Sequence, residues 1–305
     1  MSSPVISFAE GDALVDWIGL TEALVSGHQL SRANIADNFL QDGDDTLLTR
    51  SAWIKGLGLA TKSLTIFPNN THHATPTING VFSLFSDQNG VLEATIDCHL
   101  VTKLKTASDS LLAALSLARG DSKIILIVGA GAVANSLLEA FGVGFPAARF
   151  EIWNRTAERA IKLANQFPHT TAVHNLRQAV TRADIILTAT AAARPIIRGE
   201  WLRRGQHLNL IGSYRADLRE ADDEALQTAS IYTDSLDTTI SHIGEFNIPL
   251  QSGAIALNDI LADFYSLDKF RRKNDDEITV FKNGGGAHLD LMTARYLLNR
   301  WEASA

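Results

Sequence analysis

Residues 124–134, Ile-Ile-Leu-Ile-Val-Gly-Ala-Gly-Ala-Val-Ala, decide the fold of this chain. Five apolar residues run directly into a Gly-x-Gly-x-x-Ala turn, and apolar residues at helical spacing follow the turn. An all-apolar run is typical of a parallel strand that is covered on both faces. Gly129 permits the tight turn, Gly131 lets the backbone approach a pyrophosphate, and Ala134 lets the following helix pack closely on the strand.

The start of that helix is suited to phosphate, because its free N–H groups and the positive end of its dipole favour an anion there. A strand before the turn and a helix after it make the glycine pattern specific, so we predict a nucleotide cofactor. A glycine-rich turn without a ligand is the alternative interpretation. The residues predicted to bind the cofactor in this turn are Gly129, Ala130, Gly131, Ala132 and Val133.

The end of the next strand indicates which dinucleotide is bound. Residues 150–153 form that strand, and Asn154, Arg155 and Thr156 follow it. NAD-binding proteins place an acidic side chain near this point, where it accepts hydrogen bonds from the ribose hydroxyls. Here a guanidinium takes its place, and a guanidinium suits a phosphate in charge and in geometry. The sequence therefore favours NADP(H) over NAD(H); alternatively, Arg155 points into solvent and the site is indifferent.

Composition excludes several other classes of protein. The chain of 305 residues fits two domains, and 46% apolar with 20% charged residues is ordinary for a soluble globular protein. A net charge of −7 argues against a nucleic-acid partner. No apolar run reaches membrane length, and the first residues carry no signal-peptide pattern. A single cysteine, Cys98, leaves no intrachain disulfide, so we expect a cytoplasmic protein.

Strand and helix patterns alternate along the rest of the chain. A hairpin is predicted over residues 79–96, and a helix over residues 106–119. Further strands are predicted near residues 183–190, 207–213, 231–234 and 279–282, and a last helix over 288–301. Parallel strands bind ligands beyond their carboxyl ends. Loop residues predicted on that ground to contact the cofactor are Thr190, Ser213 and Tyr214.

Several further stretches occur in a recognisable order. They are Gly58-x-x-x-Lys62 with Pro68-x-Asn70, Leu100-x-Thr102 with Lys105-Thr106-Ala107, Ile211-Gly212-Ser213 with Glu220, and residues 279–282 with the glycines after them. Together with the glycine turn, they make the chain similar to the ornithine cyclodeaminase/mu-crystallin family over nearly its whole length. The resemblance implies an α/β fold in which residues 120–281 form a Rossmann domain. Residues 1–119 and 282–305 would form a mixed α+β domain for substrate binding and dimerisation, with the active site in the cleft between the domains and a homodimer as the assembly.

The resemblance also implies residue roles. Arg50 and Lys62 match family positions that hold the substrate carboxylate, and Lys105 stands where many members have arginine. Several cations of different reach can orient one carboxylate. Taken singly, an arginine or lysine on a strand is usually a solvated side chain, but three cations at family positions favour the binding role. Thr102 is assigned to the cofactor.

A run of glycines near the C-terminus is a further candidate for ligand contact. Gly285 lies in a run of three glycines, whose backbone can approach a ligand closely. Gly285 is therefore assigned to the substrate, with a simple turn as the alternative.

The segment after residue 212 departs from the cyclodeaminase pattern. Cyclodeaminases and alanine dehydrogenases of the family carry an aspartate there, whereas this chain has Tyr214. That resembles the ketimine and Δ1-pyrroline-2-carboxylate reductases of the family, although Ala216 replaces their usual proline. We therefore expect hydride transfer from NADPH to a cyclic imino acid, which gives L-proline or L-pipecolate.

Two residues are candidates for the proton chemistry of that reaction. Lys62 would bind the carboxylate or donate a proton, and Asp109 would stabilise the iminium charge, unless it is only a structural helix carboxylate. His72 and His73 lack a third ligand at metal spacing, so no metal is expected.

Three other functions stay open at this point. They are an ornithine cyclodeaminase, an amino-acid dehydrogenase, and a protein that binds NADPH and a small ligand without catalysis. Each predicts a different outcome: ammonia release from ornithine, NAD(P) reduction by an amino acid, or tight cofactor binding without turnover. In all of them the partner is a small molecule, with no nucleic acid and no membrane.

Overall fold

The computed structural model describes residues 3–73 and 75–304, and only the backbone of residues 71–73. The chain divides into two compact units. The first takes its residues from Met1–Lys105 and Gly286–Ala305, and the second from Thr106–Gly285. Among the described residues, no helix is long and apolar enough to cross a membrane.

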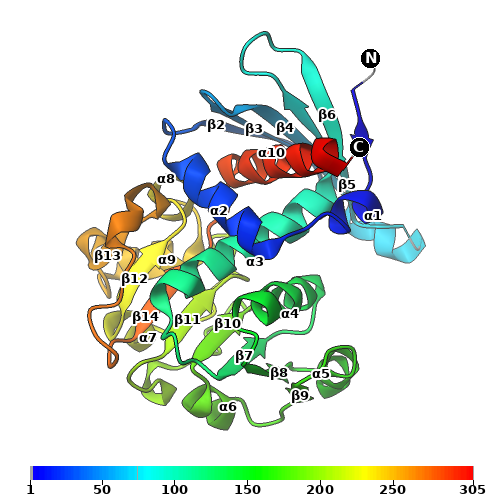
Figure 1. Ribbon diagram of the computed structural model, residues 1–305. Helices are drawn as coiled ribbons and strands as arrows, with labels where there is room; N and C mark the ends of the chain where they lie inside the picture. The colour runs from blue at the N-terminus through cyan, green and yellow to red at the C-terminus, as the bar shows by residue number, and fades with distance from the viewer. Residues whose placement is uncertain (1–2, 74, 305) are drawn as a thin grey trace. The chain divides into compact units, whose positions relative to one another are not determined.

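The first unit is built on a mixed six-stranded sheet (Figure 1). In the order β1-β6-β5-β4-β3-β2, β1 pairs in parallel with β6 and all other neighbours are antiparallel. The hairpin predicted over residues 79–96 is confirmed by β5 and β6. The strands are β1 (Val5–Ile6), β2 (Asn34–Asp42), β3 (Asp45–Ile54), β4 (Gly58–Ile66), β5 (Ile78–Phe85) and β6 (Leu92–Asp97).

Helices cover one face of that sheet. The C-terminal helix α10 (Ala287–Ser304) packs on β3, on β4 and on helix α2 (Trp17–His28), and Figure 1 shows it in red beside the strands. Side chains alternate between the two faces of a strand, and in β3 Leu48, Ala52 and Ile54 are buried on the helix side. The short helices of this unit are α1 (Phe8–Asp12) and the 3-10 turn η1 (Pro68–His73).

The second unit is a parallel sheet of eight strands in the order β13-β12-β14-β11-β10-β7-β8-β9. In chain order, β8 and β9 are added on one side of β7, and β10 and β11 are then added on its other side. This is the doubly wound order of dinucleotide-binding sheets, with its switch point between β7 and β10. The strands are β7 (Ile124–Val128), β8 (Arg149–Trp153), β9 (Thr170–Ala172), β10 (Ile185–Thr188), β11 (His207–Leu210), β12 (Ser230–Thr233), β13 (Ile260–Ala262) and β14 (Thr279–Lys282).

The predicted α/β fold with a Rossmann sheet and a second unit is therefore confirmed. Residues 125–128 of β7 are fully buried, as the all-apolar run indicates. The helices of the second unit are α4 (Ala132–Gly144), α5 (Ala157–Ala164), α6 (Leu176–Arg182), α7 (Asp223–Gln227), α8 (Leu236–Thr239) and α9 (Gly244–Ser252), with the 3-10 turns η2 (Gly199–Trp201), η3 (Leu257–Asp259) and η4 (Phe264–Lys269).

Helix α3 (Cys98–Leu117) contributes residues to both units, because the boundary falls at Lys105 within it. The sequence placed that boundary at residue 119 and the second one at 281, where the structure has 285. The helix also begins earlier than the predicted residue 106. Asp97 caps its first turn, since its Oδ1 accepts hydrogen bonds from the N–H groups of His99 and Leu100.

Candidate active site

The glycine turn opens on a cavity of about 340 Å³ at the carboxyl ends of β7, β8 and β10. Gly129 has φ +125°, and a Cβ there would stand 2.5 Å from the Ala189 carbonyl oxygen, so only glycine fits. Ala132 and Val133 begin helix α4, whose N-cap is Gly131. The lining residues are Gly129, Ala130, Gly131, Trp153, Asn154, Arg155, Arg159, Ala189, Thr190, Ala191, Ala192 and Ile196.

Two guanidinium groups line this cavity beside the end of β8. Arg155 lies just beyond β8, and Arg159, which sequence reasoning missed, follows one turn later on α5. None of the described residues that line the cavity is acidic. The carboxylate on β8, Glu151, is buried and bonded to Arg182. Two arginines and no described acidic side chain therefore line this cavity, which suits an anionic ligand.

Three other predicted cofactor residues lie in loops at this edge. Thr156 is the N-cap residue of α5, and its carbonyl accepts a hydrogen bond of 2.8 Å from Asn154 Nδ2. Ser213 is buried and donates to the Leu218 carbonyl at 2.6 Å, which closes the loop after β11. Tyr214 is exposed beside Arg215. The structure does not place Thr156, Ser213 or Tyr214 among the residues that line the cavity.

In the first unit, cations are gathered on the helix-covered face of the sheet. Arg50 on β3 stands directly opposite Lys62 on β4 in the antiparallel register, so both side chains leave the same face. Lys62 is only 5% exposed. Its Nζ donates to Thr102 Oγ1 at 2.6 Å and lies 3.4 and 3.5 Å from the two carboxylate oxygens of Asp290.

Electrostatics distinguish this cluster from an ordinary surface pair. Burial lowers the pKa of Lys62, and the charges of Lys105 and Arg50 lower it further, while Asp290 acts in the opposite direction. Arg50 is held by Asp37, which lies opposite it on β2. The cluster thus contains three cations, Arg50, Lys62 and Lys105, and two carboxylates, Asp37 and Asp290. Like charges opposite one another in a sheet are destabilising, and a bound anion would relieve them.

Two residues of helix α10 join the cluster although sequence reasoning missed them. Asp290 is buried and pairs with Lys62. His288 is buried with its ring centroid 5.5 Å from that of His28. Burial, then His28, Lys105 and Arg50, hold the pKa of His288 well below its usual value, so the ring is neutral. Thr102, assigned to the cofactor by resemblance, has its hydroxyl between Lys62 and the Cys98 carbonyl.

Asp109 and Gly285 lie in the second unit with defined partners. Asp109 is 1% exposed, and its Oδ2 accepts a hydrogen bond of 2.5 Å from Asn283 Nδ2. Gly285 has a positive φ, and its N–H donates to Asp234. Asp234 also accepts hydrogen bonds from Ser235 N–H and Thr239 Oγ1, so it anchors the glycine turn. The predicted roles of Asp109 and Gly285 toward a substrate stay predictions.

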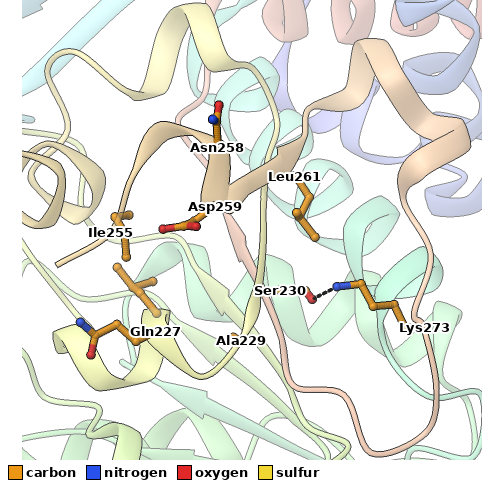
Figure 2. A pocket seen from close by; sticks show the side chains of 9 residues that line it. Gln227, Ala229, Ser230, Ile255, Asn258, Asp259, Leu261 and Lys273 are labelled. Carbon is orange, nitrogen blue, oxygen red and sulfur yellow. Dashed lines mark hydrogen bonds between the residues drawn. The ribbon is translucent and has the colours of Figure 1, made fainter. Parts of the chain in front are cut away.

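A further cavity of about 290 Å³ lies in the second unit at the amino ends of β12 and β13 (Figure 2). Asp259 and Lys273 line it. Lys273 Nζ donates a hydrogen bond of 3.3 Å to Ser230 Oγ, which Figure 2 marks with a dashed line. Ligands of such sheets bind at the carboxyl edge, so we assign it no part in the site. Among the described residues, no three His, Cys, Asp or Glu side chains are grouped to hold a metal. The side chains of His72 and His73 lie outside those described.

The parallel sheet, the glycine turn and the cavity beyond it define a dinucleotide-binding protein of the Rossmann class. Residues 47–305 match the model of the ornithine cyclodeaminase/mu-crystallin family, and the chain belongs to that family.

Its relatives include named reductases. The chain is 44% identical over 300 residues to the Δ1-pyrroline-2-carboxylate reductase of Paracoccus denitrificans, which covers 96% of this chain and 95% of the relative. It is 34% identical over 247 residues to the ketimine reductase mu-crystallin of Mus musculus, and the aligned region covers 80% of this chain and 77% of the relative. A solved structure of the Thermococcus litoralis Δ1-pyrroline-2-carboxylate reductase, in complex with NADH and L-proline, superposes with a TM-score of 0.89 at 25% identity and covers 98% of both chains.

Proposed function

We propose that this chain is an NADPH-dependent reductase that converts a cyclic imino acid, Δ1-pyrroline-2-carboxylate or Δ1-piperideine-2-carboxylate, to L-proline or L-pipecolate. Relatives that are named reductases of such compounds support an oxidoreductase of this class. The observation that carries the proposal is the buried Lys62 directly opposite Arg50. That pair suits a small anion, because two like charges face one another there.

The choice of NADPH is supported by the rim of the dinucleotide cavity. Arg155 and Arg159 lie where the 2′-phosphate of NADPH would bind, and the carboxylate that would select NADH is missing from the described lining residues. A nicotinamide dinucleotide supplies the hydride when it is bound. The Thermococcus relative holds NADH, so the preference of this chain is a proposal about its own two arginines.

The cationic cluster would bind and orient the substrate. Arg50 and Lys105 would hold the carboxylate, because charge-assisted hydrogen bonds fix both the position and the angle of a planar anion. Lys62 would hold the proton that the imine nitrogen receives. A lowered pKa makes an ammonium group a better proton donor near neutral pH, and Asp290 opposes part of the lowering of the Lys62 pKa.

The overall change then balances. The imine carbon gains a hydride, its nitrogen gains a proton, and the C=N bond becomes a CH–NH bond. Asp109 is proposed to favour the protonated imine, with a structural role through Asn283 as the alternative.

The lyase alternative receives little support from the loop after β11. The family aspartate is replaced there by Tyr214, which is exposed. Asp217, the carboxylate nearest to it in that loop, is exposed and bonded to Arg215 at 2.9 and 2.8 Å. No described carboxylate of residues 213–219 is therefore placed to handle a substrate amine.

A homodimer is proposed from the other face of the first sheet. Leu40, Leu47, Trp53 and Val81 leave the face opposite to Arg50 and Lys62, and each is 40% exposed or more. A hollow of about 420 Å³ on this face is lined by Trp53, among other residues. An antiparallel sheet normally presents polar side chains to water, so we propose that a second copy covers this apolar face.

The function is tested by following NADPH oxidation with each imino acid and identifying the amino acid formed. We expect turnover with at least one imine, faster with NADPH than with NADH. The same preparation is assayed for ammonia release from ornithine and for NAD(P) reduction by L-alanine, where we expect no activity. NADPH binding without turnover of either imine would reject the reductase and favour a binding protein.

A further inference from the structure

Glu220 lies fully buried in the second unit, between the loops that follow β10 and β11. Its Oε1 accepts hydrogen bonds from the N–H and the hydroxyl of Thr190, at 2.8 and 2.7 Å. Its Oε2 accepts from the Thr188 hydroxyl and from the Gly212 N–H, both at 2.7 Å. Four donors thus meet the four acceptor positions of one carboxylate.

The main chain fixes Glu220 from the other side. Its carbonyl accepts hydrogen bonds from the N–H groups of Ile196 and Ile197 at 2.9 Å. Its own N–H donates to Glu245 at 2.7 Å. These hydrogen bonds hold the backbone of Glu220 in place, and its carboxylate in turn positions the loops that follow β10 and β11.

The segments around Glu220 are packed without spare room. A Cβ at Gly212 would stand 2.0 Å from the Thr190 carbonyl oxygen and 2.7 Å from Glu220 Oε1. A Cβ at Gly129 would meet Ala189, the residue before Thr190, at 2.5 Å. The glycine turn and the loops after β10 and β11 are thus in contact, and Thr190 itself lines the dinucleotide cavity.

We propose that Glu220 is a positioning residue for the cofactor: it holds residues 189–192 in the conformation that completes the dinucleotide cavity. The inference rests on the proposed function in one respect, that this cavity binds a nicotinamide dinucleotide. Glu220 touches neither cofactor nor substrate, and acts through Thr190.

The charge of Glu220 is essential to this role, because only the ionised carboxylate accepts four hydrogen bonds. Burial, followed by the charge of Glu220, raises the pKa of Glu245 to about 7. Lys282, fully buried at the end of β14, supplies a positive charge to both carboxylates.

The test compares Glu220→Gln with the wild type by fluorescence titration with NADPH and by steady-state kinetics. An amide nitrogen cannot accept the hydrogen bonds that it would face. We expect the Kd and the KM for NADPH to rise at least tenfold, with the KM for the imine unchanged. Glu151→Gln is the matched control: it removes a buried carboxylate of the same unit that binds Arg182, and should leave NADPH affinity as in the wild type.

A second pair of variants keeps the test valid if Glu220→Gln does not fold. Thr188→Val removes a hydroxyl that donates a hydrogen bond to Glu220, whereas Thr188→Ser retains that hydroxyl. We expect weaker NADPH binding in the first and rescue in the second. Wild-type affinity for NADPH in Glu220→Gln or in Thr188→Val would overturn this inference and leave the proposed function unaffected. A wild-type protein that binds no nicotinamide dinucleotide would instead contradict the proposed function, and this inference with it.

Discussion

At the scale of single residues, Lys62 has the most unusual environment in the proposed site. A lysine that is 5% exposed beside two other cations is costly, because burial and like charges both disfavour its charged form. Asp290 offsets only part of that cost from 3.4 Å. A residue of this kind is expected where a protein needs a proton donor or an anion site.

The first prediction concerns Asp290. A proton donor must be protonated, so activity falls as the pH rises through the pKa of Lys62. Asp290 raises that pKa, so Asp290→Asn should move the alkaline limb of the kcat profile to lower pH by about one unit, equivalent to ~1.4 kcal/mol. The measurement is kcat for imine reduction between pH 6 and 10.

Asp12→Asn serves as the control for that profile. Asp12 forms an ion pair of 2.8 Å with Lys103, outside the cluster, and its loss should leave the limb in place. An unchanged limb in Asp290→Asn would show that Lys62 does not supply the proton.

At the scale of elements, the end of strand β8 and the start of helix α5 carry the two arginines on which the proposed preference for NADPH rests. Arg155 lies just after the strand and Arg159 on the first turn of the helix, and both line the cavity. The sequence analysis missed Arg159 because it did not predict where this helix begins.

The second prediction concerns these arginines. Replacing either one by serine should lower the preference for NADPH over NADH by tens-fold, because one charge-assisted hydrogen bond contributes about 1.5–3 kcal/mol. The ratio of kcat/KM values for the two cofactors is the measurement. Arg204→Ser, in which a highly exposed arginine of the same unit is lost, should keep the ratio. If the ratio of kcat/KM for NADPH and NADH is unchanged in both test variants, these two arginines do not recognise the 2′-phosphate.

Local sequence predicted the elements that depend on neighbouring residues, and failed where distant ones meet. The glycine turn after residue 128 and the hairpin of β5 and β6 need only short-range patterns. Asp290 meets Lys62 across 228 positions of sequence, and no spacing rule connects them. Polar residues on the buried face of α10 were the available signal, since a polar side chain inside a core needs a partner.

At the scale of the whole molecule, the first sheet has two chemically different faces. One face carries the cations beneath α10, and the other carries exposed apolar side chains. Alternation along each strand makes this division possible, because neighbouring residues point to opposite sides. We therefore expect assembly and substrate binding to be separable by mutation.

The third prediction follows from that division. Leu40→Glu combined with Val81→Glu should shift the protein from dimer to monomer in light scattering coupled to size-exclusion chromatography, because charges on a buried apolar interface are strongly disfavoured. Val143→Glu, which changes an exposed residue of α4, should leave the mass unchanged. A wild type that runs as a monomer at micromolar concentration would contradict the proposed dimer.

The central claim is that Arg50 and Lys105 recognise the carboxylate of a cyclic imine. Its most direct test is the kcat/KM of NADPH oxidation with Δ1-pyrroline-2-carboxylate against 1-pyrroline, the same ring without the carboxylate, in the wild type and in Arg50→Ala. We predict that removing the carboxylate from the substrate lowers kcat/KM at least a hundredfold in the wild type and much less in Arg50→Ala, because that variant has already lost part of its contact with the carboxylate. Equal rates on both rings in the wild type would contradict the account.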